Sequence, residues 1–206
     1  MGFLCCCFKK NQTDEQQPLV RSGSEAALPE LKNVEAKVVL LGDSGVGKSS
    51  MAMRYVEDKF DENEKSVTIG GAYLPKVVPL SNGRSVKLHI WDTGGDKRFE
   101  KMTHIFYKDA DAAIIVYDVS EAESLNVAKK RIEELAANPE NKGVYMAVVA
   151  NKSDKTPANR FIVDQGKRLA EESKAIFKMA SAKTGEGITE LFKQVVDAMY
   201  IRKSKR

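Results

Sequence analysis

Glycines, a lysine and a serine stand together in the stretch GDSGVGKS, directly after an apolar segment. The spacing fits G-x-x-x-x-G-K-S/T, in which glycines let successive backbone N–H groups turn toward an anion. Lys48 supplies a positive charge for the outer phosphates of a nucleotide, and the Ser49 hydroxyl can ligate Mg²⁺. An ordinary glycine-rich turn is the alternative, which the strand-to-helix junction disfavours. The predicted phosphate-binding loop comprises Gly42, Asp43, Ser44, Gly45, Val46, Gly47, Lys48, Ser49 and Ser50.

A second polar group could recognise a base. Asn151, Lys152 and Asp154 form the motif NKSD at the end of an apolar segment, where ligands of open parallel sheets bind. A carboxylate there can accept two hydrogen bonds from the N1–H and the exocyclic amine of guanine, whereas adenine offers no such pair. NKSD alone is as compatible with a plain turn, but a second polar group follows the apolar segment 176–180. Its members are Ser181, Ala182 and Lys183, whose backbone N–H groups could meet the guanine oxygen.

Alternating apolar strands and amphipathic helices must position these groups. The helical segments are expected at 49–60, 123–137, 160–173 and 186–200, although residues 158–165 could also continue as strand. Such alternation predicts an α/β fold, a mostly parallel sheet with helices on both faces. The strands are expected at 34–42, 86–92, 112–118 and 144–151, with a short apolar segment at 176–180.

Length and composition limit the classes of protein to which the chain can belong. A chain of 206 residues suits one domain with a flanking tail. The formal net charge of +4 is too slight and too evenly spread to indicate nucleic-acid binding. No stretch approaches the roughly 18 apolar residues that span a bilayer. We expect a flexible extension over residues 1–34, a folded domain over 35–200 and a basic tail over 201–206.

Over roughly residues 35 to 200 the chain resembles the Ras-like small GTPases, and among them the Rab family. GDSGVGKSS, WDTGGDKRFE, HIFYKDADAAIIVYD, NKSD and SAKTG carry the resemblance, and TIGGAYL is most similar to the endosomal Rab branch. The resemblance implies a P-loop NTPase of the small G-domain type with a mostly parallel six-stranded sheet. It also implies a monomeric switch in vesicle traffic that binds GTP or GDP with Mg²⁺ and hydrolyses GTP. The expected partners are effector, exchange-factor and activating proteins.

The resemblance assigns roles to single residues. Ser49 and Thr68 would ligate Mg²⁺ directly, and Asp92 would hold it through water. Lys48 and the backbone N–H of Gly95 would contact the γ-phosphate. Phe60 would pack against the guanine ring. An aromatic triad would face effectors, although aromatic residues are as often part of a core; its members are Tyr73, Trp91 and Phe106.

Two positions depart from the family pattern. Asp96 occupies the place of the glutamine that aligns the attacking water, and an ionised carboxylate only accepts hydrogen bonds and repels a phosphate. We therefore predict slow hydrolysis; the alternative is a GTP-bound scaffold that binds effectors without turnover. Phe60 lies eight positions before Thr68, one more than is usual in Rabs, which would loosen base packing and speed nucleotide exchange.

The cysteines of the chain all lie near its beginning, at Cys5, Cys6 and Cys7. Most Rab proteins carry prenylated cysteines at the C-terminus, whereas this chain ends in IRKSKR. Gly2 is a candidate for myristoylation, although Cys6 stands where that motif has Ser or Thr. Because one myristoyl chain binds membranes only weakly, palmitoylation of the cysteines would supply the second signal. The sequence thus predicts acyl anchoring at the cytoplasmic face of endosomal or plasma membranes; a free terminus with incidental cysteines is the alternative.

An ATP-using phosphotransferase remains as a third function. It would share Lys48 and Ser49 with the GTPase, but it leaves Asp154 without a role.

Overall fold

Six strands and the helices between them make up the described part of the chain, residues 34–63, 67–95, 105–155 and 160–204 of a computed structural model. The strands are β1 (Val34–Leu41), β2 (Gly71–Pro79), β3 (Ser85–Thr93), β4 (Ala112–Asp118), β5 (Tyr145–Asn151) and β6 (Ile176–Met179). The helices are α1 (Lys48–Glu57), α3 (Ala122–Ala137), the short 3₁₀ helix η2 (Pro139–Asn141), α4 (Arg160–Glu172) and α5 (Ile188–Lys203).

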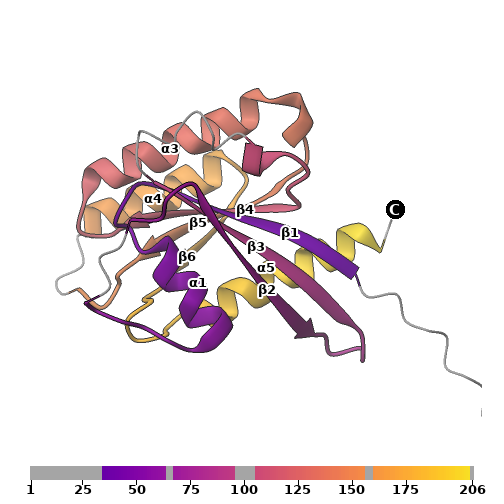
Figure 1. Ribbon diagram of the computed structural model, residues 1–206. Helices are drawn as coiled ribbons and strands as arrows, with labels where there is room; N and C mark the ends of the chain where they lie inside the picture. The colour runs from indigo at the N-terminus through magenta and orange to yellow at the C-terminus, as the bar shows by residue number, and fades with distance from the viewer. Residues whose placement is uncertain (1–33, 64–66, 96–104, 156–159, 205–206) are drawn as a thin grey trace, which may run out of the picture. The chain divides into compact units, whose positions relative to one another are not determined.

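The strands form one sheet in the order β2-β3-β1-β4-β5-β6 (Figure 1). β1 pairs in parallel with β3 and β4, and β5 pairs in parallel with β4 and β6. β2 is the antiparallel edge strand beside β3. The sheet is thus mostly parallel, which confirms the predicted fold class.

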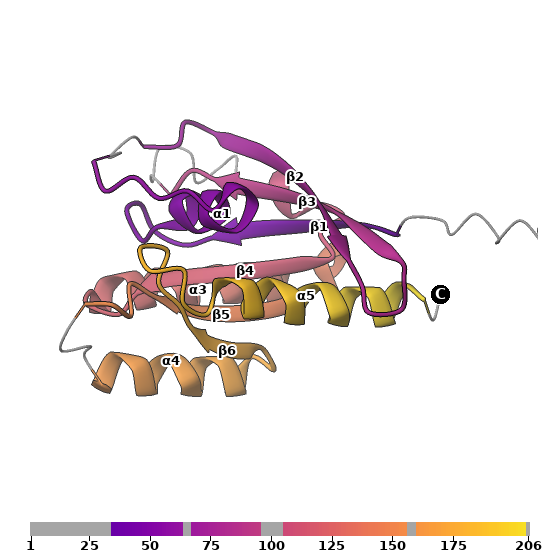
Figure 2. The same ribbon diagram turned by 90° about the horizontal axis from the view of Figure 1, so that it is seen from below.

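Helices cover both faces of this sheet. Along β1, Val38 and Leu40 face one core and Val39 and Leu41 the other, because successive strand residues point to opposite faces. The first core is closed by apolar residues of α1 and α5, and the second by those of α3 and α4. Figure 1 shows these two helix pairs on opposite sides of the sheet, and in Figure 2 α1 and α5 lie on the near side.

The structure corrects one predicted helix end, decides one open alternative and adds one strand. The helix predicted to reach residue 60 ends at Glu57, because Asp58 adopts a left-handed backbone (φ 54°) and its N–H caps the Arg54 carbonyl. Residues 160–165 are helical, so the alternative of a continuing strand is wrong. β2 had no counterpart among the strands predicted from apolar runs, since every second residue of it is exposed.

The beginning of β1 and the end of α5 lie side by side. Lys203 of α5 donates a hydrogen bond to the backbone oxygen of Glu35 (2.5 Å) and pairs with Asp111 (2.7 Å). Figure 2 shows both ends at the same side of the sheet, opposite the end of β1 that leads into the segment GDSGVGKS. None of the described helices has the length and apolarity to cross a membrane.

Candidate functional site

A cavity of about 880 Å³ opens at the carboxyl end of β1. It is bounded by the loop between β1 and α1, by the first turns of α1 and by the segment that leads to β2. Nine of the predicted site residues line it: Ser44, Gly45, Gly47, Lys48, Ser49, Ser50, Phe60, Thr68 and Gly95. Residues up to 51 positions apart in the sequence, Ser44 and Gly95, therefore line one cavity, at the edge where parallel sheets bind ligands.

The predicted phosphate loop surrounds the ammonium group of Lys48. This side chain is 5% exposed, and its Nζ donates hydrogen bonds to the backbone oxygens of Gly42 (3.0 Å) and Asp43 (2.7 Å). Burial lowers the pKa of Lys48 to about 8, while the negative charges of Asp92 and Asp43 oppose that shift. Gly47 has φ 94°, a left-handed conformation that favours glycine, and α1 begins directly after it. The loop thus offers an anion a buried cation and a helix N-terminus.

Ser49 and Thr68, which line the cavity, contact the buried Asp92 beside it. The Ser49 hydroxyl donates to Asp92 Oδ2 (2.5 Å), and the Thr68 hydroxyl donates to the same oxygen (3.3 Å). Burial raises the pKa of the Asp92 carboxyl, and the hydrogen bonds from Ser49 and Thr68 and the charge of Lys48 act against it.

The second carboxylate oxygen of Asp92 supports a cation at this position. Asp92 is 2% exposed, and its Oδ1 has no hydrogen-bond partner among the described residues. A buried acceptor beside two hydroxyls matches the oxygen ligands and bound waters that Mg²⁺ requires. Among the described residues no group of three His, Cys, Asp or Glu side chains is arranged to hold a metal ion by itself.

Gly94 and Gly95 bring the end of β3 against the phosphate loop. A side chain on Gly95 would place its Cβ 2.4 Å from backbone atoms of Asp43 and Ser44. The N–H of Gly94 donates to the Gly70 carbonyl (2.8 Å), which ties this turn to the segment after Thr68. Gly95 is therefore close enough to the loop for its backbone N–H to bind the same anion.

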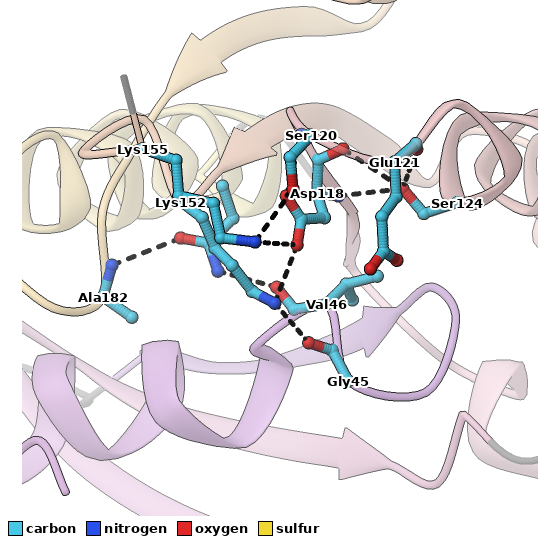
Figure 3. Close-up of polar contacts among 10 residues, drawn as sticks. Gly45, Val46, Asp118, Ser120, Glu121, Ser124, Lys152, Lys155 and Ala182 are labelled. Carbon is cyan, nitrogen blue, oxygen red and sulfur yellow. Dashed lines mark hydrogen bonds and ion pairs between the residues drawn. The ribbon is translucent and has the colours of Figure 1, made fainter. Parts of the chain in front are cut away.

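None of the predicted base-recognition residues lines the cavity, but Asn151 and Lys152 contact the phosphate loop. Asn151 is fully buried; its amide donates to the Val46 carbonyl (2.7 Å) and its oxygen accepts from the Ala182 N–H (3.2 Å). Lys152 donates to the Gly45 carbonyl (2.7 Å), as Figure 3 shows. One motif thus joins the phosphate loop to the segment of Ser181, Ala182 and Lys183.

Asp154, the proposed guanine reader, is exposed and held from one side. The buried Ser181 hydroxyl donates to Asp154 Oδ1 (2.5 Å) and accepts the Thr184 N–H (3.1 Å). Lys183 pairs with Glu62 (2.7 Å). Ser181 thus fixes Asp154 through one of its two carboxylate oxygens.

Arg54 is a site residue that sequence reasoning missed. Its guanidinium donates to the carbonyls of Ala182 (3.0 Å) and Lys183 (2.9 Å) and lies 5.9 Å from the Phe60 ring. It therefore fastens α1 to the segment expected to meet the base. The partners lie 128 and 129 positions away, so no local spacing in the sequence indicates them.

The aromatic triad brings together Tyr73 of β2, Trp91 of β3 and Phe106 of the short helical stretch 105–107. Trp91 lies 5.2 Å from Tyr73 and 5.8 Å from Phe106, measured between ring centroids. Tyr73 is 46% exposed and donates to or accepts from His89 Nδ1 (2.7 Å), while Trp91 and Phe106 are half-buried against the core under α3 and α4. One ring of the triad is thus exposed at the surface and two are packed partly into the core, and the effector contact stays a prediction.

Five predicted site residues lie outside the described residues: Gly2, Cys5, Cys6, Cys7 and Asp96.

The family match and three relatives of similar sequence agree with one another. Residues 37–201 match the model of the Ras family. The chain is 40% identical to Ras-related protein Rab-5B of Plasmodium falciparum over 185 residues, 89% of this chain and 87% of the relative. It is 41% identical to GTP-binding protein ypt5 of Schizosaccharomyces pombe, covering 82% and 80%, and 40% identical to Ras-related protein RABF2b of Arabidopsis thaliana, covering 80% of each.

Proposed function

Because this chain belongs to the Ras family, as a Rab-type small GTPase near the endosomal branch that hydrolyses GTP to GDP, we propose that it binds guanine nucleotide in the cavity beside its phosphate loop. The phosphates would lie against the backbone of Gly45 to Ser49, where helix α1 begins. The Lys48 ammonium would exchange its carbonyl partners for phosphate oxygens, and the Gly95 N–H would reach the γ-phosphate.

Mg²⁺ would be held by the hydroxyls of Ser49 and Thr68, with Asp92 holding a water of its shell. The orphaned Oδ1 of Asp92 supports this assignment. When bound, the ion would neutralise charge on the β- and γ-phosphate oxygens. The same contacts would order the segment that carries Thr68 in the triphosphate state, which is how such a switch changes its surface.

Guanine would be read by Asp154, with Asn151 and Lys152 setting its place relative to the phosphates. The observation that carries the proposal is the pair of hydrogen bonds made by Asn151, one to Val46 in the phosphate loop and one to Ala182. A single buried amide thereby fixes the distance between the phosphate site and the base site.

Competition binding tests the nucleotide. Unlabelled GTP is expected to displace fluorescent GDP from the purified protein at concentrations at least about a thousandfold lower than ATP. Asp154→Ala is expected to weaken GDP binding and narrow that gap, whereas Glu171→Ala on the exposed side of α4 should leave both affinities unchanged. Equal displacement by ATP would support the phosphotransferase instead, and unaltered selectivity in Asp154→Ala would remove the assigned role of the carboxylate.

Slow turnover is the second part of the proposal, and Asp96 motivates it. A carboxylate at this position cannot donate to the γ-phosphate while accepting from water. The alternative, a scaffold without turnover, is separated from it by phosphate release from GTP-loaded protein with and without a candidate activating protein. Release that stays at the uncatalysed rate in both would favour the scaffold.

We also propose acyl anchoring through Gly2 and Cys5, Cys6 and Cys7, beside Lys9 and Lys10. A myristoyl chain and at least one palmitoyl chain give durable residence, to which each lysine near anionic lipid adds about 1 kcal/mol. Intact mass spectrometry of the protein from its native cell tests this. The expected spectrum has a myristate increment that survives hydroxylamine and thioester increments that vanish; an unmodified terminus would contradict it. The membrane would be endosomal, as the resemblance to Rab5-type relatives suggests.

Effectors would contact the surface around Tyr73. Tyr73 is joined there by Ile69, which is 80% exposed, at the segment that nucleotide would order. Loss of binding by Tyr73→Ala to a GTP-dependent partner, with unchanged GDP affinity, would support this; unchanged partner binding would refute it.

A further inference from the structure

Two lysines of one turn share a buried carboxylate beside the nucleotide site. Asp118 is the last residue of β4, and its side chain has no exposed surface. Its Oδ2 lies 2.8 Å from Lys152 Nζ and 3.1 Å from Lys155 Nζ, and Figure 3 shows both lysines converging on it. Lys152 belongs to the NKSD motif, whereas Lys155 lies just beyond that motif.

Ser120 completes the surroundings of the Asp118 carboxylate. The Ser120 N–H and hydroxyl donate to Oδ1 (2.9 and 2.6 Å), and Lys155 also donates to the Ser120 hydroxyl oxygen (2.8 Å). The two lysines and the two donors of Ser120 all oppose the cost of burying the charge of Asp118. We refer to Asp118, Ser120, Lys152 and Lys155 as the Asp118 cluster.

Asp154 is carried by a turn, and the Asp118 cluster holds both ends of that turn. Lys152 has a left-handed backbone (φ 62°), and the N–H of Lys155 donates to its carbonyl (3.0 Å), which closes the turn. Asp154 lies between these two residues, so both of its flanks are tied to Asp118. On its other side, Asp154 is held by Ser181.

The two lysines differ in what else they contact. Lys152 also donates to Gly45 of the phosphate loop, so changing it disturbs the phosphate site directly. Lys155 has contacts to Asp118 and Ser120, is 46% exposed, and does not line the cavity. Its effect on a nucleotide must therefore pass through the turn.

We propose that Lys155 is a positioning residue for guanine recognition: by sharing Asp118 with Lys152, it fixes the turn that carries Asp154 and slows release of the nucleotide. The inference rests on the proposed contact between Asp154 and guanine. Freeing the far side of the turn would let the carboxylate move away from the exocyclic amine, which costs one of the two hydrogen bonds that distinguish guanine.

Release of fluorescent GDP and binding of inosine diphosphate test this in the full chain. Inosine lacks the exocyclic amine, so the ratio of inosine diphosphate to GDP dissociation constants reports on how Asp154 is aimed. Lys155→Ala is expected to release GDP about three to ten times faster and to lower that ratio by a similar factor. Lys155→Arg, which keeps the cation, should restore both values.

A control and a coupled variant make the result specific. Lys167→Ala removes an exposed lysine of α4 that pairs with Asp164 (3.3 Å), and it should change neither value. In an Asp118→Asn background, Lys155→Ala should add nothing; if that background does not fold, the comparison of Lys155→Ala with Lys155→Arg decides alone. A change below about twofold, an equal effect of Lys167→Ala or an unaltered inosine ratio overturns the inference. Should the parent bind no GDP at all, the proposed function falls and this inference with it.

Discussion

The hydroxyl oxygens of Ser49 and Thr68 lie 2.8 Å apart, and both hydroxyls face Oδ2 of Asp92. Ser49 lies in the first turn of α1, Thr68 precedes β2, and Asp92 lies near the end of β3. Three separate segments thus place oxygen atoms at one point beside the cavity. A cation at that point would hold the segment of Thr68 against α1. Loss of the cation would release that segment.

Removing the Ser49 hydroxyl should uncouple nucleotide binding from Mg²⁺. We expect Ser49→Ala to release GDP at least about ten times faster than the parent in millimolar Mg²⁺, because an oxygen ligand is lost. With a chelator present, the two proteins should release GDP at similar rates. The measurement is fluorescent GDP release with and without Mg²⁺.

Ser173→Ala provides the matched control for that experiment. The Ser173 hydroxyl donates to the Leu169 carbonyl at the end of α4, away from the cavity wall. Its Mg²⁺ dependence should equal that of the parent. An Ser49→Ala protein that retains the full Mg²⁺ effect would argue against a metal ligand at this position.

Replacing Asp96 by glutamine should accelerate hydrolysis. Glutamine can accept from the attacking water and donate toward the γ-phosphate, and it removes a negative charge from a site where charge develops. We expect Asp96→Gln to raise the single-turnover rate of GTP-loaded protein by about tenfold or more. Asp96→Asn, which removes the charge but shortens the reach, should fall between the two; a rise below about twofold for Asp96→Gln would refute the explanation.

The stabilising effect of Asp118 should disappear in acid. Burial raises the pKa of this carboxyl, but hydrogen bonds from Lys152, Ser120 and Lys155 outweigh burial and hold the pKa at about 2, below its ordinary value of 3.8. The unfolded chain therefore binds the proton more tightly. The carboxylate contributes stability of about 2 kcal/mol above about pH 4, and this contribution is lost as the pH falls toward 2.

Urea unfolding in excess GDP measures that contribution. Asp118→Asn is expected to lower the free energy of unfolding by about 2 kcal/mol near pH 6, and the difference from the parent should shrink between about pH 4 and pH 2. Asp164→Asn, which changes an exposed carboxylate of α4, should show a small difference at every pH. A difference for Asp118→Asn that does not depend on pH would contradict the assigned charge.

Gly166 of α4 leaves room for the buried Tyr117. An added Cβ would lie 2.1 Å from the Tyr117 hydroxyl oxygen and 2.7 Å from Cζ. Gly166→Ala should gain about 1 kcal/mol of helix propensity but lose more by displacing the ring, so we expect a net destabilisation of about 1–3 kcal/mol in thermal or urea unfolding.

A double variant identifies the clash as the cause. Tyr117→Phe removes the closest atom, so Gly166→Ala should cost less in that background than in the parent. The neighbouring Gln165 is exposed, and Gln165→Ala should change stability by less than about 0.5 kcal/mol. Equal costs of Gly166→Ala in both backgrounds would mean that the strain lies elsewhere.

Continuous apolar runs explain why most of the fold was predictable. The second half of β1 and most of β4 and β5 are buried on both faces, so their sequences there are continuous apolar runs and strand prediction succeeded. β2 alternates exposed and half-buried residues and contains Pro75 and Pro79, which are tolerated because an edge strand has one side without a partner. The end of α1 was mispredicted because an aspartate, not a glycine, takes the left-handed cap at Asp58.

The candidate site also has a part that the sequence predicted and a part that it did not. The phosphate loop was predictable because its residues are consecutive, and their spacing carries the chemistry. Arg54 and Asp118 act through partners that only the folded chain brings near, 128 positions away for Arg54 and 37 for the contact of Asp118 with Lys155. Long-range pairing of this kind leaves no periodic signal in a single sequence. The roles given to Phe60, Thr68 and Asp154 stay predictions until nucleotide binding is measured.

The contact of Lys203 with Glu35 holds the end of α5 next to the beginning of β1. The first strand therefore starts where the last helix finishes, so an acyl anchor of the kind proposed and an anchor at the opposite terminus would join the domain on the same side of the sheet. Figure 2 shows the other end of β1, which leads into the phosphate loop, on the opposite side. Either attachment would thus leave the nucleotide cavity away from the point where the anchor joins the domain.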